Sequence, residues 1–424
     1  MKHIKNKIKI AALAGLSSLA VACASSQKTH SSDAVASKAD NNEMDNNYLT
    51  LSAEQRSAVN ATNNFAIQLF KTQHGMTSSV ISPLSVSYLM GILANGANAD
   101  TQKQILATLG FNDISLQDIN EAYKALINHA TRCDKSTTIN IANYVAVNDG
   151  VTLNANFKNT ATQMFDAEIQ NLDFKSAKAV EIINGWCNKQ TNGMIPNIIS
   201  QLDANATSVL MNAIYFNGTW ASKFDKSNTK EENFQGYTRD IKRLKMMHQE
   251  DNFLYANNNT FSAIKLPYGN GNYSMIVLLP NNGKSIEDML AILDTDALDH
   301  LQRDMEECLV DLKLPKFTTT TELQLNTPIT KLGAPLMFDA SKADFSNLSA
   351  NHFHVSQMLQ KAKIEVGEEG TKAAAVTAAV MLTSLEPREP RRVQFHANRP
   401  FVYMITEADS NAIFFIGKFT GSED

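Results

Sequence analysis

The residue types that carry hydrolytic or metal chemistry do not form a catalytic motif in this chain. G-x-S-x-G and H-E-x-x-H are absent, and the two S-x-x-K matches, at Ser25 and Ser227, lack the motifs that accompany such a serine in enzymes. Apart from Cys23, the cysteines are Cys133, Cys187 and Cys308, and none stands near a histidine at a metal-ligand spacing. The sequence therefore argues against a hydrolase of the cell envelope, and we expect no metal, no cofactor and no disulfide framework.

One stretch has the composition of a strand that can join a β-sheet. Between Thr371 and Leu385 there is a single charge, Lys372, and no proline. Successive residues of a strand point to opposite faces, which places Lys372 and Ala374 on one face. A strand that enters a sheet above a packed core needs small inner side chains, because the core has no spare volume. The other face meets that need: Thr371, Ala373, Ala375, Thr377 and Ala379. An Ala-rich run is also typical of a buried helix.

The order of residues around this stretch resembles a known family. E-E-G-T-K-A-A-A-V-T at 368–377, followed by F-H-A-N-R-P-F at 395–401, resembles the hinge and distal anchor of the reactive-centre loop of serpins. Serpins inhibit proteases by inserting this loop into their own sheet. Lys372 replaces the acidic residue usual in the family, but it falls on the outer face. The resemblance implies a hinge of eight residues: Glu368, Glu369, Gly370, Thr371, Ala373, Ala374, Ala375 and Thr377.

The resemblance also implies which bond a protease attacks. Counted forward from Glu368, the reactive bond is Ser384–Leu385, whereas counting back from the F-x-x-x-R-P-F anchor gives a bond a few residues later. We favour the forward count because the length between hinge and cut decides how far an attached protease is dragged, and because Glu386 and Pro387 end the insertable stretch. The alternatives for the residue before the cut are Leu382, Thr383 and Arg388.

What the resemblance implies for function is an irreversible suicide-substrate inhibitor of serine proteases, with cysteine proteases as a second target class. The protein would not be an enzyme; it would trap the acyl-enzyme by inserting its cleaved loop. Small or apolar residues before the cut suit elastase-, subtilisin- or chymotrypsin-like enzymes, while Arg388 would suit trypsin-like ones. The alternative is a non-inhibitory serpin-like binding protein, although such members tend to lose the small hinge residues that this chain keeps.

Further segments match the family in order, from about residue 58 to 420. The segment 181–195 resembles the helix over the central sheet, with Asn184, Trp186 and Thr191 at matching positions. Three other segments imply a site where the sheet opens: Ser82, Ser85, Asn212, Trp220, Ser356 and Gln360. On its residues alone, Ser82 is placed to cap a helix that begins at Pro83. Gln360 stands where the family commonly has histidine; because glutamine donates and accepts but does not titrate, no histidine-based pH sensitivity is expected.

The sequence also predicts a helix and a pair of strands among the elements that must position these residues. Phe65, Leu69 and Phe70 recur at helical spacing within 58–73, which predicts a helix facing the core. Two β-rich apolar runs within 264–280 meet at Gly269-Asn270-Gly271 and predict a hairpin. The resemblance implies the α+β serpin fold, about nine helices around three β-sheets, with an exposed reactive-centre loop. No linker or repeat divides residues 49–424, so we expect a single domain.

The first 48 residues read as an export signal and a tether. Residues 1–22 carry four lysines ahead of a short apolar run, Ile10 to Ala22, too short to span a membrane. The run ends in L-A-V-A-C, which resembles a bacterial lipobox and predicts lipidation of Cys23; an ordinary secretory signal is the alternative. Residues 23–48 have almost no large apolar side chains, which predicts a flexible tether. We therefore expect an exported lipoprotein of the cell envelope, at the outer membrane or cell surface.

Composition excludes other partner classes. The chain is 43% hydrophobic with a net charge of −5, and it has no basic footprint for nucleic acid. The local basic run of Arg388, Arg391 and Arg392 is either a contact for a protease or a solvated stretch of loop. We expect a monomer that touches the membrane through its lipid only.

Overall fold

A computed structural model describes residues 48–73, 75–371 and 390–422. The chain divides into two units, residues 1–46 and 47–424, and the described residues all belong to the second. The predicted signal, Cys23, the tether apart from Tyr48, and residues 372–389 with the predicted reactive bond therefore lie outside the described residues. Within the described ranges, no helix has both the length and the apolar composition needed to cross a bilayer.

Nine α-helices occur among the described residues, as the family resemblance implied. They are α1 (Ala53–Lys71), α2 (Pro83–Gly96), α3 (Ala99–Thr108), α4 (Leu116–Ala130), α5 (Ala155–Phe165), α6 (Ala177–Gln190), α7 (Ile286–Ile292), α8 (Thr295–Arg303) and α9 (Asn326–Leu332). Two short 3-10 turns, η1 (Lys226–Asn228) and η2 (Leu336–Phe338), are also present.

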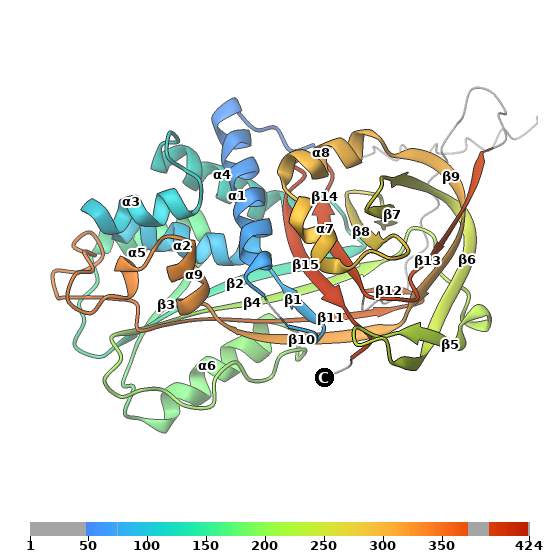
Figure 1. Ribbon diagram of the computed structural model, residues 1–424. Helices are drawn as coiled ribbons and strands as arrows, with labels where there is room; N and C mark the ends of the chain where they lie inside the picture. The colour runs from blue at the N-terminus through green and yellow to red at the C-terminus, as the bar shows by residue number, and fades with distance from the viewer. Residues whose placement is uncertain (1–47, 74, 372–389, 423–424) are drawn as a thin grey trace, which may run out of the picture. The chain divides into compact units, whose positions relative to one another are not determined.

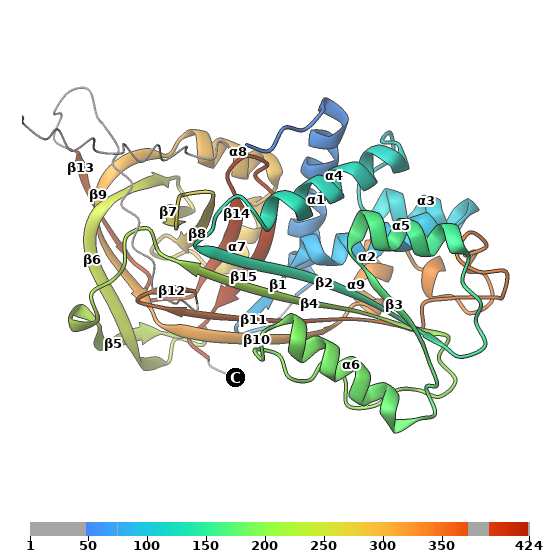
Figure 2. The same cartoon turned by 180° about the vertical axis from the view of Figure 1, so that it is seen from behind.

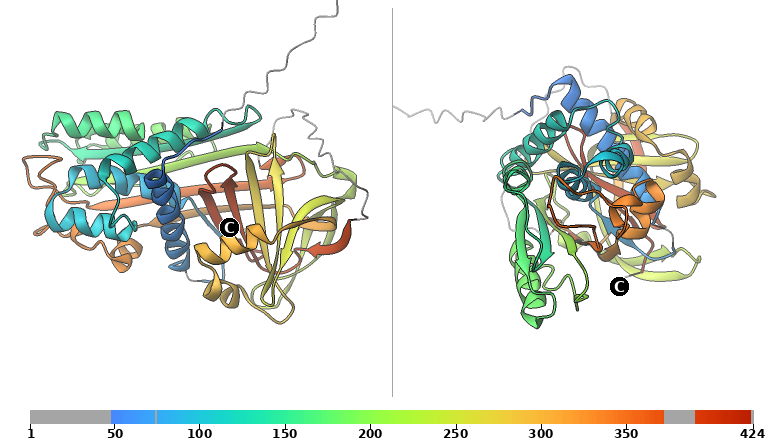
Figure 3. Two further views of the ribbon diagram at one scale, coloured as in Figure 1. Left: turned by 90° about the horizontal axis from the view of Figure 1, so that it is seen from above. Right: turned by 90° about the vertical axis from the view of Figure 1, so that its left-hand side faces the viewer.

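A six-stranded sheet forms the centre of the second unit (Figure 1). Its order is β10 (Phe317–Gln324), β11 (Gln357–Gly367), β12 (Gly370–Thr371), β4 (Ser208–Thr219), β2 (Thr137–Asn148) and β3 (Glu168–Leu172). All but one of the residues of β4 are buried, because both faces of the sheet are covered. The helix α6 covers one face and α1, α2, α4 and α5 lie on the other, as the end-on view in Figure 3 also shows.

The remaining nine strands form a second sheet. Its order is β1 (Ser79–Ile81), β15 (Ile413–Phe419), β14 (Phe401–Glu407), β8 (Tyr273–Pro280), β7 (Phe261–Tyr268), β6 (Ile241–Asn257), β9 (Glu306–Pro315) and β13 (Arg391–His396), with β5 (Lys230–Gln235) on β6. Figure 2 shows β6 curving past the end of the central sheet. Because the 17 residues of β6 pair with β7 at one end and with β5 at the other, two of the family's three sheets join here into one continuous sheet.

The helix expected at 58–73 is confirmed as α1, which begins earlier, at Ala53. Its start is set by Ser52, whose hydroxyl accepts from the Gln55 N–H while the Gln55 side chain accepts from the Ser52 N–H. This reciprocal pair is a capping box. Phe65, Leu69 and Phe70 are buried as the spacing predicted.

The hairpin expected at 264–280 is confirmed as β7 and β8, which pair in antiparallel register from Phe261↔Pro280 to Tyr268↔Tyr273. Gly269 has φ +45°, and a Cβ there would lie 1.9 Å from the Ser136 hydroxyl oxygen. Glycine is therefore required at this turn both by backbone conformation and by space.

The cysteines match the expectation. Cys133, Cys187 and Cys308 are free and buried. Burial raises the pKa of the Cys187 thiol to about 12 and also raises that of Cys308. Buried neutral thiols of this kind behave as small apolar side chains.

Candidate functional site

The short strand β12 lies between β4 and β11 and separates them at one end. Gly370 pairs with Thr219 of β4 and Gly367 of β11, and Thr371 pairs with Gly218 and Val366. Further along, β4 and β11 pair directly in parallel, from Val209↔Gln357 to Ile214↔Ala362. The central sheet is therefore parted at the hinge end and closed at the other end.

Gly370 occupies a position that admits no side chain. Its φ is +143°, and a Cβ there would lie 2.1 Å from the carbonyl oxygen of Gly218 and 2.8 Å from the Cα of Thr219. Both atoms belong to the backbone and cannot move aside cheaply. The close approach of two strands at this point thus depends on glycine.

Thr371 points to the inner face of the sheet, as the alternation of small residues predicted. It is fully buried, and its hydroxyl hydrogen-bonds the Tyr268 hydroxyl at 2.7 Å. The other predicted members of this face, together with Ala374 on the opposite face, lie outside the described residues: Ala373, Ala375, Thr377 and Ala379. The described start of the segment therefore has the expected orientation.

Trp220 lies at the hinge, where the resemblance placed it. Its indole N–H donates to the carbonyl of Gly367 at 2.9 Å, and its backbone N–H donates to the carbonyl of Glu369 at 3.0 Å. The indole also stacks on Tyr268, with ring centroids 4.3 Å apart and planes 11° apart. Trp220 therefore holds the end of β11 through its side chain and the segment that leads into β12 through its backbone.

The two glutamates of the hinge are held by basic side chains. Glu368 binds Lys316 at 2.7 Å and accepts from the Thr229 hydroxyl at 3.0 Å. Glu369 binds Lys223 and Lys226, each at 3.0 Å. None of these partners was singled out from the sequence, because they lie far from the hinge in the chain and stand in no recognisable spacing.

These contacts lower the pKa of both carboxyl groups. Burial by itself raises the pKa of Glu368, but the hydrogen bonds from Lys316 and Thr229 outweigh it and the net shift is downward. For Glu369 the hydrogen bonds from Lys223 and Lys226 lower the pKa directly. Both glutamates are therefore ionised and paired at neutral pH.

The buried amide of Gln360, on β11, hydrogen-bonds both the start of α2 and β4. Its Oε1 accepts from the Ser82 N–H at 2.9 Å, and its Nε2 donates to the Ser82 carbonyl at 2.7 Å and to Asn212 Oδ1 at 3.1 Å. Gln360, Ser82 and Asn212 are all fully buried. The amide thus ties the start of α2 to both β11 and β4, and it does so by donating and accepting at once.

Ser82 has the predicted N-cap position of α2, but its predicted capping bond is wrong. Its hydroxyl makes no bond to a backbone N–H of the helix and instead lies 2.7 Å from the hydroxyl of Ser85. The Ser82 N–H and carbonyl are used by Gln360. The serine pair therefore belongs to the network beneath the sheet.

The network continues to Asn143 of β2, a residue the sequence did not suggest. Asn212 donates from Nδ2 to Asn143 Oδ1 at 3.0 Å and to the carbonyl of Ala142 at 3.1 Å. Asn143 is 1% exposed. Gln360, Asn212 and Asn143 thus form a row of amides across three strands of the sheet.

Ser356 does not join this row. Its hydroxyl accepts from the Thr207 N–H at 2.9 Å and lies 3.2 Å from the Thr207 hydroxyl. These residues immediately precede β11 and β4. Ser356 therefore fastens the closed end of the β4–β11 pair, whereas Trp220 lies at the parted end.

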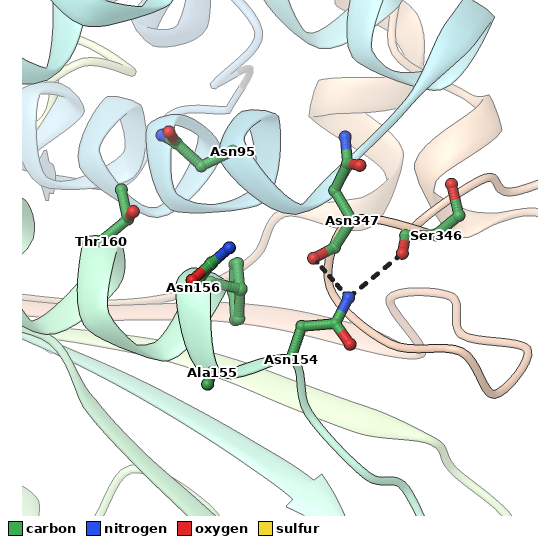
Figure 4. A pocket seen from close by; sticks show the side chains of 8 residues that line it. Asn95, Asn154, Ala155, Asn156, Thr160, Ser346 and Asn347 are labelled. Carbon is green, nitrogen blue, oxygen red and sulfur yellow. Dashed lines mark hydrogen bonds between the residues drawn. The ribbon is translucent and has the colours of Figure 1, made fainter.

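A polar pocket with a cavity volume of about 530 Å³ lies at the far end of α2, near Asn95 (Figure 4). The Asn154 amide donates to the carbonyls of Ser346 and Asn347 at 3.3 and 2.9 Å. Asn95 donates to Asn120 Oδ1 at 2.9 Å. These amides are used in joining neighbouring segments, and the pocket is separated from Ser82 by the length of α2, about 20 Å at 1.5 Å per residue.

Replacing Gln360 should destabilise the closed sheet. Gln360→Ala removes three buried hydrogen bonds and leaves Ser82 and Asn212 without those partners, which we expect to cost about 2–3 kcal/mol of unfolding free energy. Urea unfolding monitored by circular dichroism measures this loss of unfolding free energy. The control is Gln357→Ala on the same strand, because that side chain bonds only Gln324 in an exposed position. Equal effects of the two substitutions would contradict the role given to Gln360.

Acidification should release the hinge. Because the pKa values of Glu368 and Glu369 are lowered in the folded state, their stabilisation is present above the ordinary glutamate pKa of 4.5 and is lost as the pH falls through the lowered values. Trp220 reports on this, since the chain has only one other tryptophan, Trp186. In a Trp186→Phe protein, we expect the emission of Trp220 to shift to the red on acidification.

In the same background, Glu368→Gln should show part of this red shift already at neutral pH. The control is Glu365→Gln, because Glu365 pairs with Lys363 at 2.6 Å on β11, outside the hinge. If both variants keep the emission and the acid midpoint of the parent, the ion pairs do not hold the hinge.

Comparison with known proteins assigns the family. A family model described as serpin (serine protease inhibitor) matches residues 60–421. Glia-derived nexin from Rattus norvegicus is 33% identical over 353 residues, covering 80% of this chain and 86% of the relative. Antitrypsin from Bombyx mori is 32% identical over 356 residues, covering 82% and 90%.

Solved structures agree with the sequence relatives. The native state of tengpin, a thermophilic serpin, matches with a TM-score of 0.79 at 28% identity, covering 86% of this chain and 94% of tengpin. Thyroxine-binding globulin in complex with thyroxine matches with a TM-score of 0.78 at 27% identity, covering 87% and 100%. The chain therefore belongs to the serpin family of protease inhibitors and is not an enzyme.

Proposed function

We propose that this protein is an irreversible suicide-substrate inhibitor of serine proteases, with cysteine proteases as a second target class. The observation that carries the proposal is the position of β12, which already occupies the space between β4 and β11. A protease that attacks the loop would form an acyl bond to it, and the freed arm would extend β12 along the sheet before the acyl bond is hydrolysed.

The register of β12 supports a full-length insertion. Gly370 pairs with Thr219 and Thr371 with Gly218, so continuing the same register would bring Ala375 opposite Ile214 and Met381 opposite Ser208. Ser208 is the first residue of β4. The inserted strand would thus match β4 along its whole length and end shortly before the predicted cut at Ser384–Leu385.

The energy available from insertion is sufficient to oppose deacylation. About ten added residues contribute backbone hydrogen bonds worth ~0.5–1.5 kcal/mol each. Some ten kcal/mol corresponds to about seven decades in rate if all of it were used. The direct β4–β11 pairs would have to separate, but they would be replaced by pairs of each strand with the inserted one.

The target class follows from the loop sequence. Ser384 before the cut, with Leu382 and Thr383 ahead of it, presents small or apolar side chains. These suit elastase-, subtilisin- or chymotrypsin-like enzymes; trypsin-like enzymes cutting after Arg388 are the second possibility.

A binding function is the second candidate. Thyroxine-binding globulin, whose structure is that of a complex with thyroxine, shares this fold. The Gly370 and Thr371 geometry and the small residues that follow favour inhibition over this alternative.

We further propose that the protein is a lipoprotein of the cell envelope. The lipobox-like L-A-V-A-C places a cysteine directly after the signal. Acyl chains on Cys23 would anchor the protein, since each buried methylene contributes about 0.8 kcal/mol. The protein would then act as a monomer on proteases that reach the membrane surface.

Inhibition should appear as a covalent complex. On mixing with elastase, subtilisin, chymotrypsin or trypsin, we expect a complex that survives denaturing electrophoresis with at least one of the first three. Mass spectrometry of the released carboxy-terminal peptide should find it beginning at Leu385. A peptide beginning at Glu389 would replace Ser384 by Arg388 as the residue before the cut. Cleavage by all four without any stable complex would overturn inhibition and favour the binding protein.

Loop insertion should fail when a charge is placed on the inner face of the inserted strand. Ala375→Arg places a guanidinium where it cannot be buried without a partner, so the protein should be cut as a substrate without forming the complex. The matched control is Ala374→Arg, the same change on the face that carries Lys372, which should keep more of the complex. If Ala375→Arg retains unchanged stoichiometry, the inserted face has been assigned wrongly.

Anchoring should depend on one residue. Cys23→Ser should move the protein from the membrane fraction to the soluble fraction and abolish labelling by a radioactive fatty acid. Retention of label in this variant would show that the lipid is attached elsewhere.

A further inference from the structure

His129 meets two acidic side chains from a distant part of the sequence, Glu407 and Asp409, outside the hinge. His129 lies in the last turn of α4, Glu407 ends β14, and Asp409 lies in the turn between β14 and β15; these elements are labelled in Figure 1. His129 Nε2 lies 3.3 Å from Glu407 Oε1 and 3.6 Å from Asp409 Oδ2. One ligand atom of each residue lies within 4.8 Å of those of the other two.

The spacing of these atoms suits a metal ion. Zinc binds histidine nitrogen and carboxylate oxygen at about 2.0–2.2 Å, and a tetrahedral arrangement then separates neighbouring ligand atoms by about 3.3 Å. The observed separations of 3.3 and 3.6 Å are close to this value. The two separations from His129 therefore already suit a shared ion, and the two carboxylate oxygens lie within 4.8 Å of each other.

Both carboxylate ligands are also held in place by further hydrogen bonds. Glu407 Oε1 accepts from the Asp409 N–H at 2.8 Å, and Oε2 accepts from the Ser410 N–H at 2.8 Å and its hydroxyl at 2.6 Å. Asp409 Oδ2 accepts from the Leu49 N–H at 2.8 Å. Outer partners of this kind orient metal ligands and raise affinity.

Burial of the two carboxylates favours binding of a cation by the cluster. The side chains of His129 and Glu407 are 5% and 1% exposed, and that of Asp409 is 19% exposed. Buried carboxylates are costly unless they are paired or coordinate a metal. A protonated His129 compensates one of the two charges, whereas a divalent ion bound by neutral His129 compensates both.

We propose that His129, Glu407 and Asp409 form a zinc site, with the fourth position open to water on the side of Asp409. The bound ion would fasten the segment at Leu49, through Asp409, to the end of α4 and to β14. Because zinc would bind the folded chain, it would raise stability in proportion to the logarithm of its concentration above the dissociation constant. The prediction of no metal rested on residues close together in the sequence, whereas these ligands come from positions 129, 407 and 409.

The prediction that no cysteine lies near a histidine at a metal-ligand spacing is wrong for one pair, His129 and Cys133, which are four residues apart in the sequence. Cys133 is buried and donates to the Tyr273 hydroxyl at 3.4 Å, outside the proposed ligand set.

Zinc binding to the untagged full chain tests the proposal. Isothermal titration with zinc chloride should show one saturable site, and the melting temperature should rise with zinc but not with magnesium chloride, because magnesium requires an octahedral set of oxygen ligands. Asp409→Asn should weaken zinc binding at least tenfold while leaving an oxygen for the Leu49 N–H. His129→Gln should abolish the binding.

The matched control is His248→Gln. His248 also lies beside a carboxylate, with Nε2 2.9 Å from Asp311 Oδ1, and His396 Nε2 lies 3.1 Å from the other oxygen of Asp311, but these side chains lie outside the cluster. The His248→Gln protein should bind zinc as the parent does. Circular dichroism of each variant without zinc excludes a folding defect as the cause. Absence of saturable binding, or equal binding by the parent and Asp409→Asn, would show that the cluster is an ion-pair network only.

Discussion

The side chain of Gln360 determines how the central sheet is held together. It bonds the backbone of Ser82 on one side and Asn212 on the other, and all three residues are buried. A buried amide that loses a partner costs more than the bond itself contributes, because the remaining group is left without water. The closed half of the β4–β11 pair therefore depends on this amide, and any strand that enters the sheet must displace its bond to Asn212.

The parted half of the sheet is held by different forces. There the backbone of Gly370 approaches β4 too closely for a side chain, the buried carboxyl of Glu368 binds Lys316, and Glu369 binds two lysines at the surface. Surface ion pairs are weak and screened by salt. The pairs of Glu369 are therefore displaced more easily than the amide row under the closed half. The sheet therefore has one end held by buried hydrogen bonds and one end that is displaced more easily. The proposed loop insertion requires an end of the second kind.

The helix α6 adds a further constraint. Its small apolar core joins Trp186 and Ile183 to Met211 of β4 and to Leu359 of β11, on both sides of the seam that a new strand would enter. Separating β4 from β11 must therefore change the packing beneath α6. Close-packed interiors do not absorb such a change without movement, so the proposed insertion would require α6 to shift.

Local features of the molecule could be predicted from the sequence. The apolar spacing around Phe65 predicted α1, and the glycines at 269 and 271 predicted the β7–β8 turn, since both depend on contacts between residues near in the chain. Family motifs placed Trp220 and the hinge glycine, and Thr371 has the predicted inward orientation. The start of α1 and the unused cap at Ser82 were not predicted, because helix ends are decided by a few hydrogen bonds that competing partners can take.

Only the tertiary structure decided which distant side chains meet. Ser356, immediately before β11, fastens the closed end of the β4–β11 pair, whereas Gln360, four residues later, bonds Asn212 within that pair. The partners of Glu368 and the group of His129, Glu407 and Asp409 are brought together by strand order and by turns between elements. Most of these contacts join residues tens to hundreds of positions apart and leave no periodicity in the sequence. Sequence alone thus determined the elements and the hinge, while packing of those elements decided how charge and hydrogen bonds are shared between them.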